Sequence, residues 1–552
     1  MKKLLLAAAI CGLYTQVAAQ SASGASTPSS YPTRDIEPFL DLKFTTAERD
    51  TFLRNLQSNQ QLIAGLHAFQ IDNSVDMSLR FDPVPAGFVG ETKQLSIEWG
   101  LPKSAEVPAN PSELAFLPVH KLAVLMNNKK ISSVQLTRLY IDRLKKYSDT
   151  LKCMITLLEA SALQAAKRAD DEIAKGKYRG PLHGIPYGIK DLLAVEGTRT
   201  TWGAVPYKDQ VINQTATVVR KLDAAGAVLL VKLTMGALAL GDIWYGGVTK
   251  NPWNLKQGSS GSSAGSASAT AAGLVGFTIG TETLGSIVSP STRCGVSGLR
   301  PSFGRVSRHG AMALCWSMDK IGPICRSALD CAMVFDAIRG KDELDQNVRD
   351  VPFNFSRKTD VRKLRVGYCK NLFDETYLTK DNDQKALEVL RNIGVNLEAI
   401  TFGSDIPVAS LRLILSAEAA AAFDDLTRSN RDSLLTDQRR NAWPNSFRSS
   451  RFISAVDYIN ATRVRTRLVN EFHEKTRNYD VIVAPSFGGA QLLTTNLTGT
   501  PCVVVPNGFN ANGSPTSISF IGKLDSEAAL ALLAHAYQEA TGWDEERPPF
   551  FK

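Results

Sequence analysis

Residues 258–287 read GSSGSSAGSASATAAGLVGFTIGTETLGSI, and this stretch decides the fold class. It starts with the glycine- and serine-rich run Gly258 to Ser266, continues through an alanine-rich segment and reaches an apolar run, Leu274 to Gly280. A run of glycine and serine is more often a flexible linker than a site. Here it lies between apolar elements, where small residues let backbones approach one another and a substrate closely. We therefore interpret the stretch as a packed helix and strand that carry polar turns.

Short apolar runs bounded by glycine and proline recur on both sides of this stretch and indicate buried strands. We predict strands at residues 185–190, 227–232, 274–280, 481–484, 503–505 and 518–521. Segments with helical spacing lie before and between them, and we predict helices at residues 119–127, 134–147, 159–175, 217–225, 265–272 and 525–541. Strands that alternate with helices predict an α/β fold whose sheet is covered by helices on both faces.

The composition is typical of a large globular protein. Of 552 residues, 44% are hydrophobic and 21% are charged, which excludes a disordered or fibrous chain. The formal charge of +9 is spread over the chain without a basic run. Because a nucleic-acid partner requires clustered lysine and arginine, we predict that the protein binds no nucleic acid.

The first residues resemble a secretory signal. Lys2 and Lys3 precede an apolar stretch from Leu4 to Tyr14, and a cut after Ala19 is indicated. This stretch is shorter than the about 20 residues that a membrane span needs, and we expect no stable membrane span. We predict a signal peptide at residues 1–19, a flexible spacer at 20–34, and an exported protein, periplasmic or secreted after signal-peptide cleavage.

The segment after the spacer indicates a helical extension before the main domain. From Thr45 to Phe69 apolar residues recur at roughly helical spacing, and a proline-rich link follows. We place a helical N-terminal extension and link at residues 35–112 and the main domain at 113–552. The seven cysteines beyond the leader form no CxxC pair, so neither a zinc ribbon nor a redox motif is indicated, and we expect mostly buried thiols.

A second motif, Gly184-Ile-Pro-Tyr-Gly-Ile-Lys-Asp191, ends a strand-like run in a lysine. A single lysine is usually a solvated surface charge. Here Ile189 precedes Lys190 and two leucines follow Asp191, so burial of the amine is expected.

With these motifs in place, the chain resembles the amidase signature family from about Glu113 to its C-terminus. Further fragments carry the resemblance in the same order: Asn251-Pro-Trp-Asn254, Cys294-Gly-Val-Ser-Gly-Leu-Arg-Pro301, Asp319-Lys-Ile-Gly-Pro323 and Asn496-Leu-Thr-Gly-Thr-Pro501. The resemblance implies a large mixed central sheet with helices on both faces. It also implies a small-molecule or peptide amide as substrate, and neither a metal nor an organic cofactor.

The family's catalytic residues are a lysine, a serine in a cis peptide and a nucleophilic serine. By matching motifs, the resemblance places them at Lys190, Ser262 and Ser286. Ser259 and Ser260 form a second serine pair, but the spacing between Ser262 and Ser286 fits the family. The implied reaction is acylation of Ser286, release of ammonia or an amine, and hydrolysis of the acyl-enzyme.

The chemistry explains these residue types. A serine hydroxyl is a poor nucleophile until an adjacent base accepts its proton, and a neutral lysine can be that base. Because the reference pKa of lysine is about 10.4, work near neutrality requires a drop of roughly three units, which burial can supply. We also expect the backbone N–H groups of Thr283, Leu284 and Gly285, with that of Ser286, to form an oxyanion hole.

The chain departs from the family pattern around the nucleophile. The family has Asp-x-Gly-Gly-Ser followed by Ile-Arg, whereas this chain has Glu282, Leu284 and Val288 at the corresponding places. The arginine is therefore missing, and Leu284 is expected to narrow the acyl site. These departures leave a catalytically impaired, amidase-like binding protein as an alternative.

Two further alternatives stay open. Gly261-Ser-Ser-Ala-Gly265 satisfies G-x-S-x-G with Ser263 in the middle, which indicates an esterase of α/β-hydrolase type if a strand leads into Ser263 and a histidine joins it. Residues 251–257 do not read as a strand, which argues against this alternative. The glutaminase subunit of tRNA-dependent amidotransferases shares the fold, and the leader argues against it. The identity of the amide and the oligomeric state are not predicted.

Overall fold

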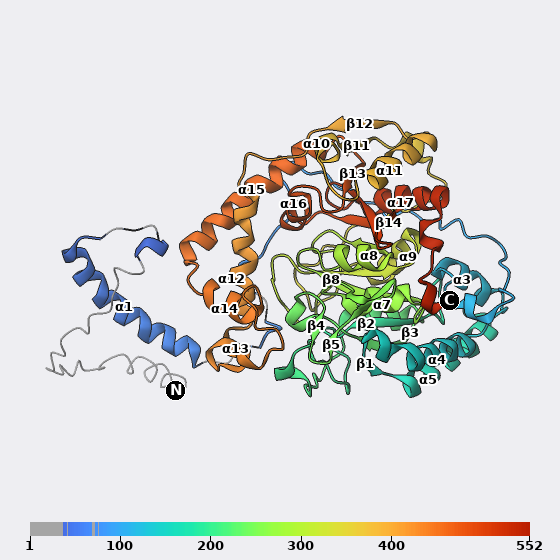
Figure 1. Ribbon diagram of the computed structural model, residues 1–552, viewed down its shortest axis with the longest axis horizontal. Coiled ribbons are helices and arrows are strands. Elements are labelled where there is room, and N and C mark those ends of the chain that lie inside the picture. The colour runs from blue at the N-terminus through green and yellow to red at the C-terminus, as the bar shows by residue number, and fades with distance from the viewer. Residues whose placement is uncertain (1–36, 41, 43, 69–71, 76) are drawn as a thin grey trace, which may run out of the picture. The chain divides into compact units, whose positions relative to one another are not determined.

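The structure is a computed structural model that describes residues 37–40, 42, 44–68, 72–75 and 77–552 (Figure 1). The predicted signal peptide and spacer lie outside these residues. The chain divides into two compact units, Met1–Gln70 and Ile71–Lys552. In the first unit, a short 3-10 helix, η2 (Glu37–Leu40), precedes α1 (Thr46–His67). A capping box begins α1, because the backbone N–H of Glu48 donates to Thr45 Oγ1 and that of Thr45 donates to Glu48 Oε2.

Within residues 77–552, eleven strands form one mixed sheet in the order β1-β3-β2-β8-β10-β9-β14-β15-β13-β11-β12. They are β1 (Met154–Leu157), β2 (Pro186–Lys190), β3 (Val228–Leu233), β8 (Phe277–Glu282), β9 (Ser297–Arg300), β10 (Lys320–Cys325), β11 (Val366–Cys369), β12 (Leu397–Ile400), β13 (Val481–Pro485), β14 (Cys502–Phe509) and β15 (Pro515–Ile521). Two small ribbons pair β4 (Ile243–Trp244) with β5 (Gly247–Val248), and β6 (Lys250–Asn251) with β7 (Asn254–Gly258). β2 runs parallel to both β3 and β8, whereas β10 runs antiparallel to β8.

Helices surround this sheet (Figure 1). They are α2 (Pro111–Leu114), α3 (Val119–Asn127), α4 (Ser133–Leu151), α5 (Glu159–Ala174), α6 (Thr217–Ala224), α7 (Ala264–Ala271), α8 (Val288–Cys294), α9 (Ala328–Ile338), α10 (Lys370–Asp374), α11 (Lys380–Asn392), α12 (Arg412–Ala422), α13 (Asp424–Arg428), α14 (Trp443–Ser450), α15 (Ala455–Thr476), α16 (Gln491–Thr498) and α17 (Glu527–Thr541). Short 3-10 helices are η3 (Val205–Tyr207), η4 (Ala237–Ala239), η5 (Val361–Lys363), η6 (Val408–Leu411), η7 (Arg431–Leu434), η8 (Trp543–Glu545) and η9 (Pro549–Phe551).

Adjacent residues of β10 show that both faces of the sheet are covered. Ile324 belongs to a small apolar cluster with Ala267 of α7. The next residue, Cys325, belongs to the main core, which includes Leu329 of α9 and Leu533 of α17. Because successive side chains of a strand point to opposite faces, α7 covers one face and α9 with α17 the other. The predicted α/β fold, a large mixed sheet covered by helices on both faces, is confirmed.

One predicted strand is displaced along the chain. The apolar run 274–280 was expected to be the strand, but β8 spans Phe277–Glu282. α7 ends at Ala271, and Gly273 adopts a positive φ of 64°, so Leu274 and Val275 lie in the connection and are buried there. Apolar residues in a buried connection resemble a strand in sequence, which explains the shift. The strand therefore extends to Glu282, four residues before Ser286.

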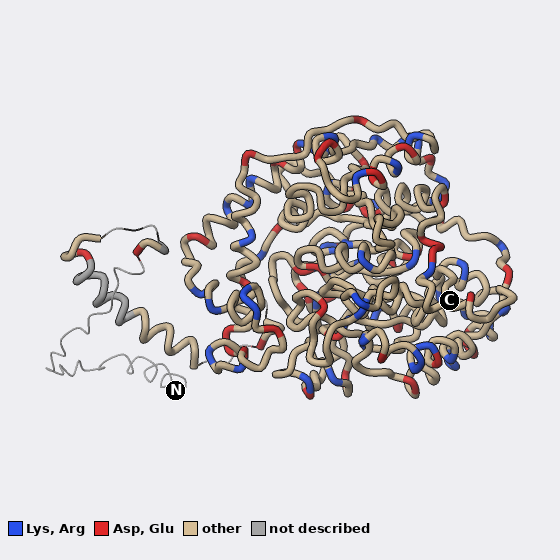
Figure 2. The backbone as a smooth tube through the Cα atoms, in the orientation of Figure 1, with Lys and Arg blue, Asp and Glu red and all other residues tan. Residues whose placement is uncertain are grey.

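Charge and apolarity are distributed as in a globular protein. Figure 2 shows that lysine and arginine alternate with aspartate and glutamate along the described chain. None of the helices in the described residues combines the length and apolarity needed to cross a bilayer. The cysteines from Cys153 to Cys502 are buried free thiols, as expected.

Candidate active site

Lys190 ends β2 and is completely buried next to β8. Its Nζ donates hydrogen bonds of 2.8 Å to Ser262 Oγ and of 2.8 Å to Thr281 Oγ1. Burial lowers the pKa of the amine to about 7, although the charges of Asp319 and Glu282 act in the opposite direction. A substantial fraction of the amine is therefore neutral near pH 7 and can accept a proton.

Asp191, the residue that follows Lys190, binds groups other than Lys190. Asp191 pairs with the buried Lys232, at 3.1 Å between Oδ1 and Nζ, and accepts a hydrogen bond of 2.8 Å from the backbone N–H of Thr201. The carboxylate is thereby engaged away from Lys190, because neighbouring residues of an extended chain point in opposite directions. Lys190 thus lacks the adjacent carboxylate that would hold it protonated.

Ser262 is the serine that the structure brings to Lys190. The peptide bond between Gly261 and Ser262 is cis, as the resemblance implies. A Cβ atom on Gly261 would lie 1.9 Å from the carbonyl oxygen of Gly241, so this close approach requires glycine. In the alternative serine pair, Ser259 Oγ donates to the carbonyl of Ser260. The described contacts therefore favour Ser262 over that pair.

Ser286 lies in the turn between β8 and α8, and the backbone connects this turn to the serine-rich loop. The N–H of Ser263 donates to the carbonyl oxygen of Ser286 at 3.2 Å, which places Ser286 beside the residue that follows Ser262. Ser286 is 8% exposed, whereas Ser262 is 1% exposed. Ser286 is thus the more accessible of the two predicted catalytic serines.

The N–H groups of this turn divide into two sets. The N–H groups of Ile287 and Val288 both donate to Glu282 Oε2, and the N–H group of Ser289 donates to the carbonyl of Gly285. By contrast, no hydrogen bond in the described chain is donated by the N–H groups of residues 283–286. Gly285 has a positive φ of 81° in this turn. The N–H groups of Thr283, Leu284 and Gly285, which were predicted as oxyanion donors, thus have no acceptor among the described residues.

Glu282 holds the far side of the turn. Its carboxylate is buried and receives a hydrogen bond of 2.9 Å from Arg300 Nη1 and one of 2.8 Å from Asn496 Nδ2, besides the two N–H groups after Ser286. Burial opposes ionisation, but Arg300 and these hydrogen bonds outweigh it and lower the pKa of Glu282 to about 2. Arg300 of β9 therefore supplies a positive charge near the turn.

Replacing Glu282 with glutamine is expected to destabilise the protein by about 3–5 kcal/mol, because it leaves the buried Arg300 charge unpaired. The midpoint of thermal unfolding should fall accordingly. The matched control is Glu474→Gln, which removes an exposed partner of Arg477 at 3.2 Å and should cost less than about 1 kcal/mol. Equal unfolding midpoints for the two variants would contradict the role of Glu282.

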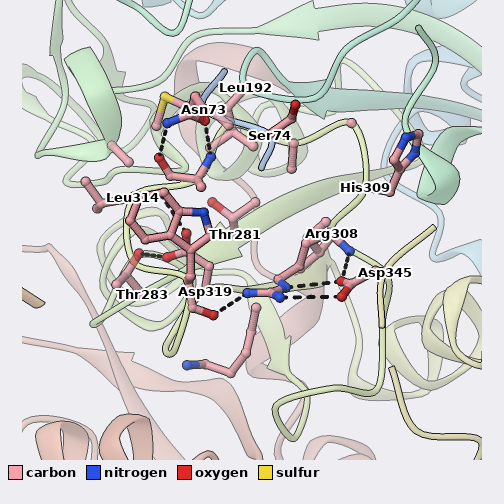
Figure 3. A pocket seen from close by; sticks show the side chains of 18 of the residues that line it. Asn73, Ser74, Leu192, Thr281, Thr283, Arg308, His309, Leu314, Asp319 and Asp345 are labelled. Carbon is pink, nitrogen blue, oxygen red and sulfur yellow. Dashed lines mark hydrogen bonds and ion pairs between the residues drawn. The ribbon is translucent and has the colours of Figure 1, made fainter. Parts of the chain in front are cut away.

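The lining of a small cavity of about 70 Å³ includes Thr281, Thr283 and Asp319 (Figure 3). Thr283 Oγ1 donates to Asp319 Oδ1 at 2.5 Å, and the N–H groups of Leu314 and Cys315 donate to Asp319 Oδ2. A cavity of this size holds a few waters or one small group. It reaches the partner of Lys190, Thr281, and is therefore part of the candidate active site.

Sequence reasoning missed the roles of Thr281, Arg300 and Asn496. All three lie in fragments that carry the family resemblance, but nothing in the sequence indicates that Asn496 contacts Glu282, because 214 residues separate them. Thr281 directly follows the apolar part of β8, and this position could have identified it as a partner of Lys190. A polar residue at the end of a buried strand next to a lysine strand is a candidate partner for that lysine.

The hydrogen bonds of Ser263 argue against the α/β-hydrolase esterase alternative, in which Ser263 would be the nucleophile. Ser263 Oγ donates to the carbonyl of Thr281 and accepts from its N–H, both at 3.1 Å, so this hydroxyl is engaged with the end of β8. The expectation that residues 251–257 contain no strand was wrong, because β7 is present, but it belongs to a two-stranded ribbon and not to the central sheet. In the described residues, no histidine is hydrogen-bonded to Ser263 Oγ, whose two bonds go to Thr281, and no cluster of histidine, cysteine and acidic residues could hold a metal.

A family model described as Amidase matches residues 135–494, more than half of the chain. The chain belongs to the amidase family. Its relatives include a glutamyl-tRNA(Gln) amidotransferase subunit of Moorella thermoacetica, 32% identical over 483 residues that cover 79% of this chain and 99% of the relative. The subunit of the same name from Bacillus cereus strain Q1 is 34% identical over 475 residues, which cover 77% of this chain and 97% of the relative.

Solved structures of this family superpose on the chain. The native peptide amidase from Stenotrophomonas maltophilia has a TM-score of 0.69 and 29% identity, and the match covers 80% of this chain and all of that one. A structure named PAM12A has a TM-score of 0.70 and 28% identity, with 80% of this chain and 100% of that chain covered. The amidase fold therefore extends over most of the chain.

The comparison corrects the predicted localisation. The relatives from Moorella, Marinomonas and Bacillus are all named as subunits of an amidotransferase that acts on glutamyl-tRNA(Gln), and charged tRNA is a substrate of the cell interior. The prediction of an exported protein, periplasmic or secreted, was therefore wrong. The prediction depended on a short compositional pattern in residues 1–19, which lie outside the described residues. The similarity to the amidotransferase subunits, by contrast, extends over several hundred residues.

Proposed function

We propose that this amidase-family protein hydrolyses a carboxylic amide through an acyl-enzyme on Ser286, with Lys190 as base and Ser262 as proton relay. The observation that carries the proposal is the hydrogen bond of 2.8 Å between the buried amine of Lys190 and Ser262 Oγ. The relatives support it, because the names amidotransferase and peptide amidase both denote chemistry at an amide.

In the acylation step, Ser286 Oγ attacks the amide carbon while its proton passes through Ser262 to Lys190. Neutral Lys190 accepts this proton because burial lowers its pKa to about 7. Negative charge then develops on the substrate oxygen, and the N–H groups of Thr283, Leu284 and Gly285 stabilise it. Removing one such donor typically costs about 10²–10³ in rate.

In the second half of the reaction, the proton returns. Lys190 gives it back through Ser262 to the departing nitrogen, so that ammonia or an amine leaves instead of an unstable amide anion. Water then attacks the acyl-enzyme and gives its proton to the same relay. Thr281 donates no proton in this scheme, since its hydroxyl accepts from Lys190 and holds the amine in place.

The first test is ammonia release from a panel of primary amides with aliphatic, aryl, fatty acyl and peptide acyl groups, measured as a function of pH. The neutral form of Lys190 is the active base, so kcat/KM should rise as pH increases through about 7 and reach a plateau above it. Below that pKa the rate should change about tenfold per pH unit. A flat profile from about pH 5 to 9 with the protein still folded would exclude Lys190 as the base.

A further inference from the structure

A second, larger cavity of about 780 Å³ is lined by residues that are close in sequence to both predicted catalytic serines. Ser260, two residues before Ser262, lines it, and so does Ser289, three residues after Ser286. The small cavity of about 70 Å³ holds only a small group. If the substrate has a large part, this second cavity is the place that can hold it.

Helix α8 connects the nucleophile with a cation in this cavity. The N–H of Ser289 donates to the carbonyl of Gly285 at 2.7 Å, so helical hydrogen bonding begins before α8 and includes Ser286. Residues 286, 289 and 293 are then spaced as i, i+3 and i+7, which places them on one helix face. Seven residues of helix correspond to about 10 Å. The backbone of Arg293 thus lies roughly 10 Å along the helix from that of Ser286, and its side chain lines the cavity.

The charge of Arg293 is available to a ligand. Its side chain is exposed, and its Nη1 donates one hydrogen bond, of 3.2 Å, to Gln257 Oε1. The ion pairs among the described residues include none from Arg293. Most other lining groups are hydroxyls and amides, such as those of Thr292, Ser514 and Asn510. Leu378, Pro485 and Phe487 add apolar surface, so the lining suits an alkyl chain that ends in a polar group.

The charged residues that line the cavity also favour one orientation of an anionic ligand. Glu375 belongs to its lining and comes from a different segment of the chain, after α10. A negative group on a ligand is repelled near Glu375 and attracted near Arg293. Electrostatics therefore directs an anionic end of the ligand to the C-terminal end of α8.

We propose that this cavity binds the acyl chain of the substrate and that Arg293 pairs with a carboxylate on that chain, about 10 Å from the scissile carbonyl. The inference rests on the proposed function. A primary amide releases ammonia, which needs no cavity of its own, so the acyl chain is the part that the larger cavity receives. The substrate class is thus a primary monoamide of an extended dicarboxylic acid.

The test compares the monoamide of octanedioic acid, whose two end carbons lie roughly 9 Å apart when extended, with neutral octanamide. For the wild-type protein, kcat/KM should be about tenfold higher for the monoamide, mainly through a lower KM. Arg293→Gln should abolish this preference, so that kcat/KM becomes equal for the two amides. Arg293→Glu should instead favour the amide of ω-aminooctanoic acid, which carries an ammonium group at the same distance.

The matched control is Lys256→Gln, which removes an exposed cation of β7, next to Gln257, that does not line the cavity. This variant should keep the preference, because the interaction is local. Equal kcat/KM for the two amides in the wild type would overturn this inference and leave the proposed function intact.

A binding experiment distinguishes failure of the proposed function from failure of the proposed carboxylate site. If neither amide is hydrolysed, binding of octanedioate to Ser286→Ala protein is measured by calorimetry. If octanedioate binds to this protein and no longer binds once Arg293→Gln is added, the proposed carboxylate site is supported. If octanedioate does not bind to Ser286→Ala protein, the proposed site is overturned.

Discussion

Ser286→Ala is expected to lower amide turnover by a factor of about 10⁴–10⁶, because it removes the hydroxyl that is proposed to form the acyl-enzyme. The variant should also lose covalent labelling by a serine-directed fluorophosphonate, which is measured by mass spectrometry of the intact folded protein. Labelling tests the nucleophile independently of the unknown substrate. It also separates an enzyme from a catalytically impaired binding protein, since the latter forms no adduct.

The matched control for this prediction is Ser289→Ala. Ser289 lies on the same helix face, one turn later, and lines the larger cavity, but no contact with Ser262 or Lys190 is described for it. Its variant should be labelled as readily as the wild type. An adduct that persists in Ser286→Ala, or that is absent from the folded wild type, would count against Ser286 as nucleophile.

Lys190→Ala is expected to lower kcat/KM for amides by about 10⁴ and for matched esters by at least tenfold less. The difference follows from the leaving groups. An amine must receive the returned proton before it can depart, whereas an alkoxide needs this proton less. The measurement is the ratio of amide to ester turnover for substrates with the same acyl chain, in wild type and variant.

Lys320→Met provides the control, because Lys320 is the same residue type in a similar environment. It is buried in β10 and lines the same small cavity as Thr281, and burial also lowers its pKa to about 7, but its Nζ donates to the carbonyl of Met318 and not to a serine. Its variant should keep the amide-to-ester ratio even if stability falls. An unchanged ratio in Lys190→Ala would show that the lysine returns no proton.

The order of helices and strands could be predicted where the pattern is local. The helix at residues 119–127 and the strands around Lys190 and Val481 were found at or within a residue of their bounds. β10 was not predicted, because Gly322 and Pro323 interrupt it and read as a turn in sequence. In the sheet this strand is central, and the proline is tolerated between β8 and β9. Tertiary pairing therefore outweighs local propensity there.

The candidate site shows the same division. Lys190, Ser262 and Ser286 could be predicted because family motifs mark each of them, and the structure brings the first two together at 2.8 Å. The support for the turn could not be predicted. Arg300 and Asn496 reach Glu282 from β9 and α16, so their contact depends on strand order and not on sequence spacing.

The opposite orientations of Lys190 and Asp191 make chain length in β2 a functional constraint. A shift of the strand by a single residue would aim the aspartate at Ser262 and the lysine at Lys232. The site would then hold an acid where it needs a base, and the core would contain two unpaired cations side by side. Substitutions along the cavity walls can therefore accumulate and alter substrate preference, whereas insertion or deletion of one amino acid between Gly184 and Lys190 removes activity and folding together.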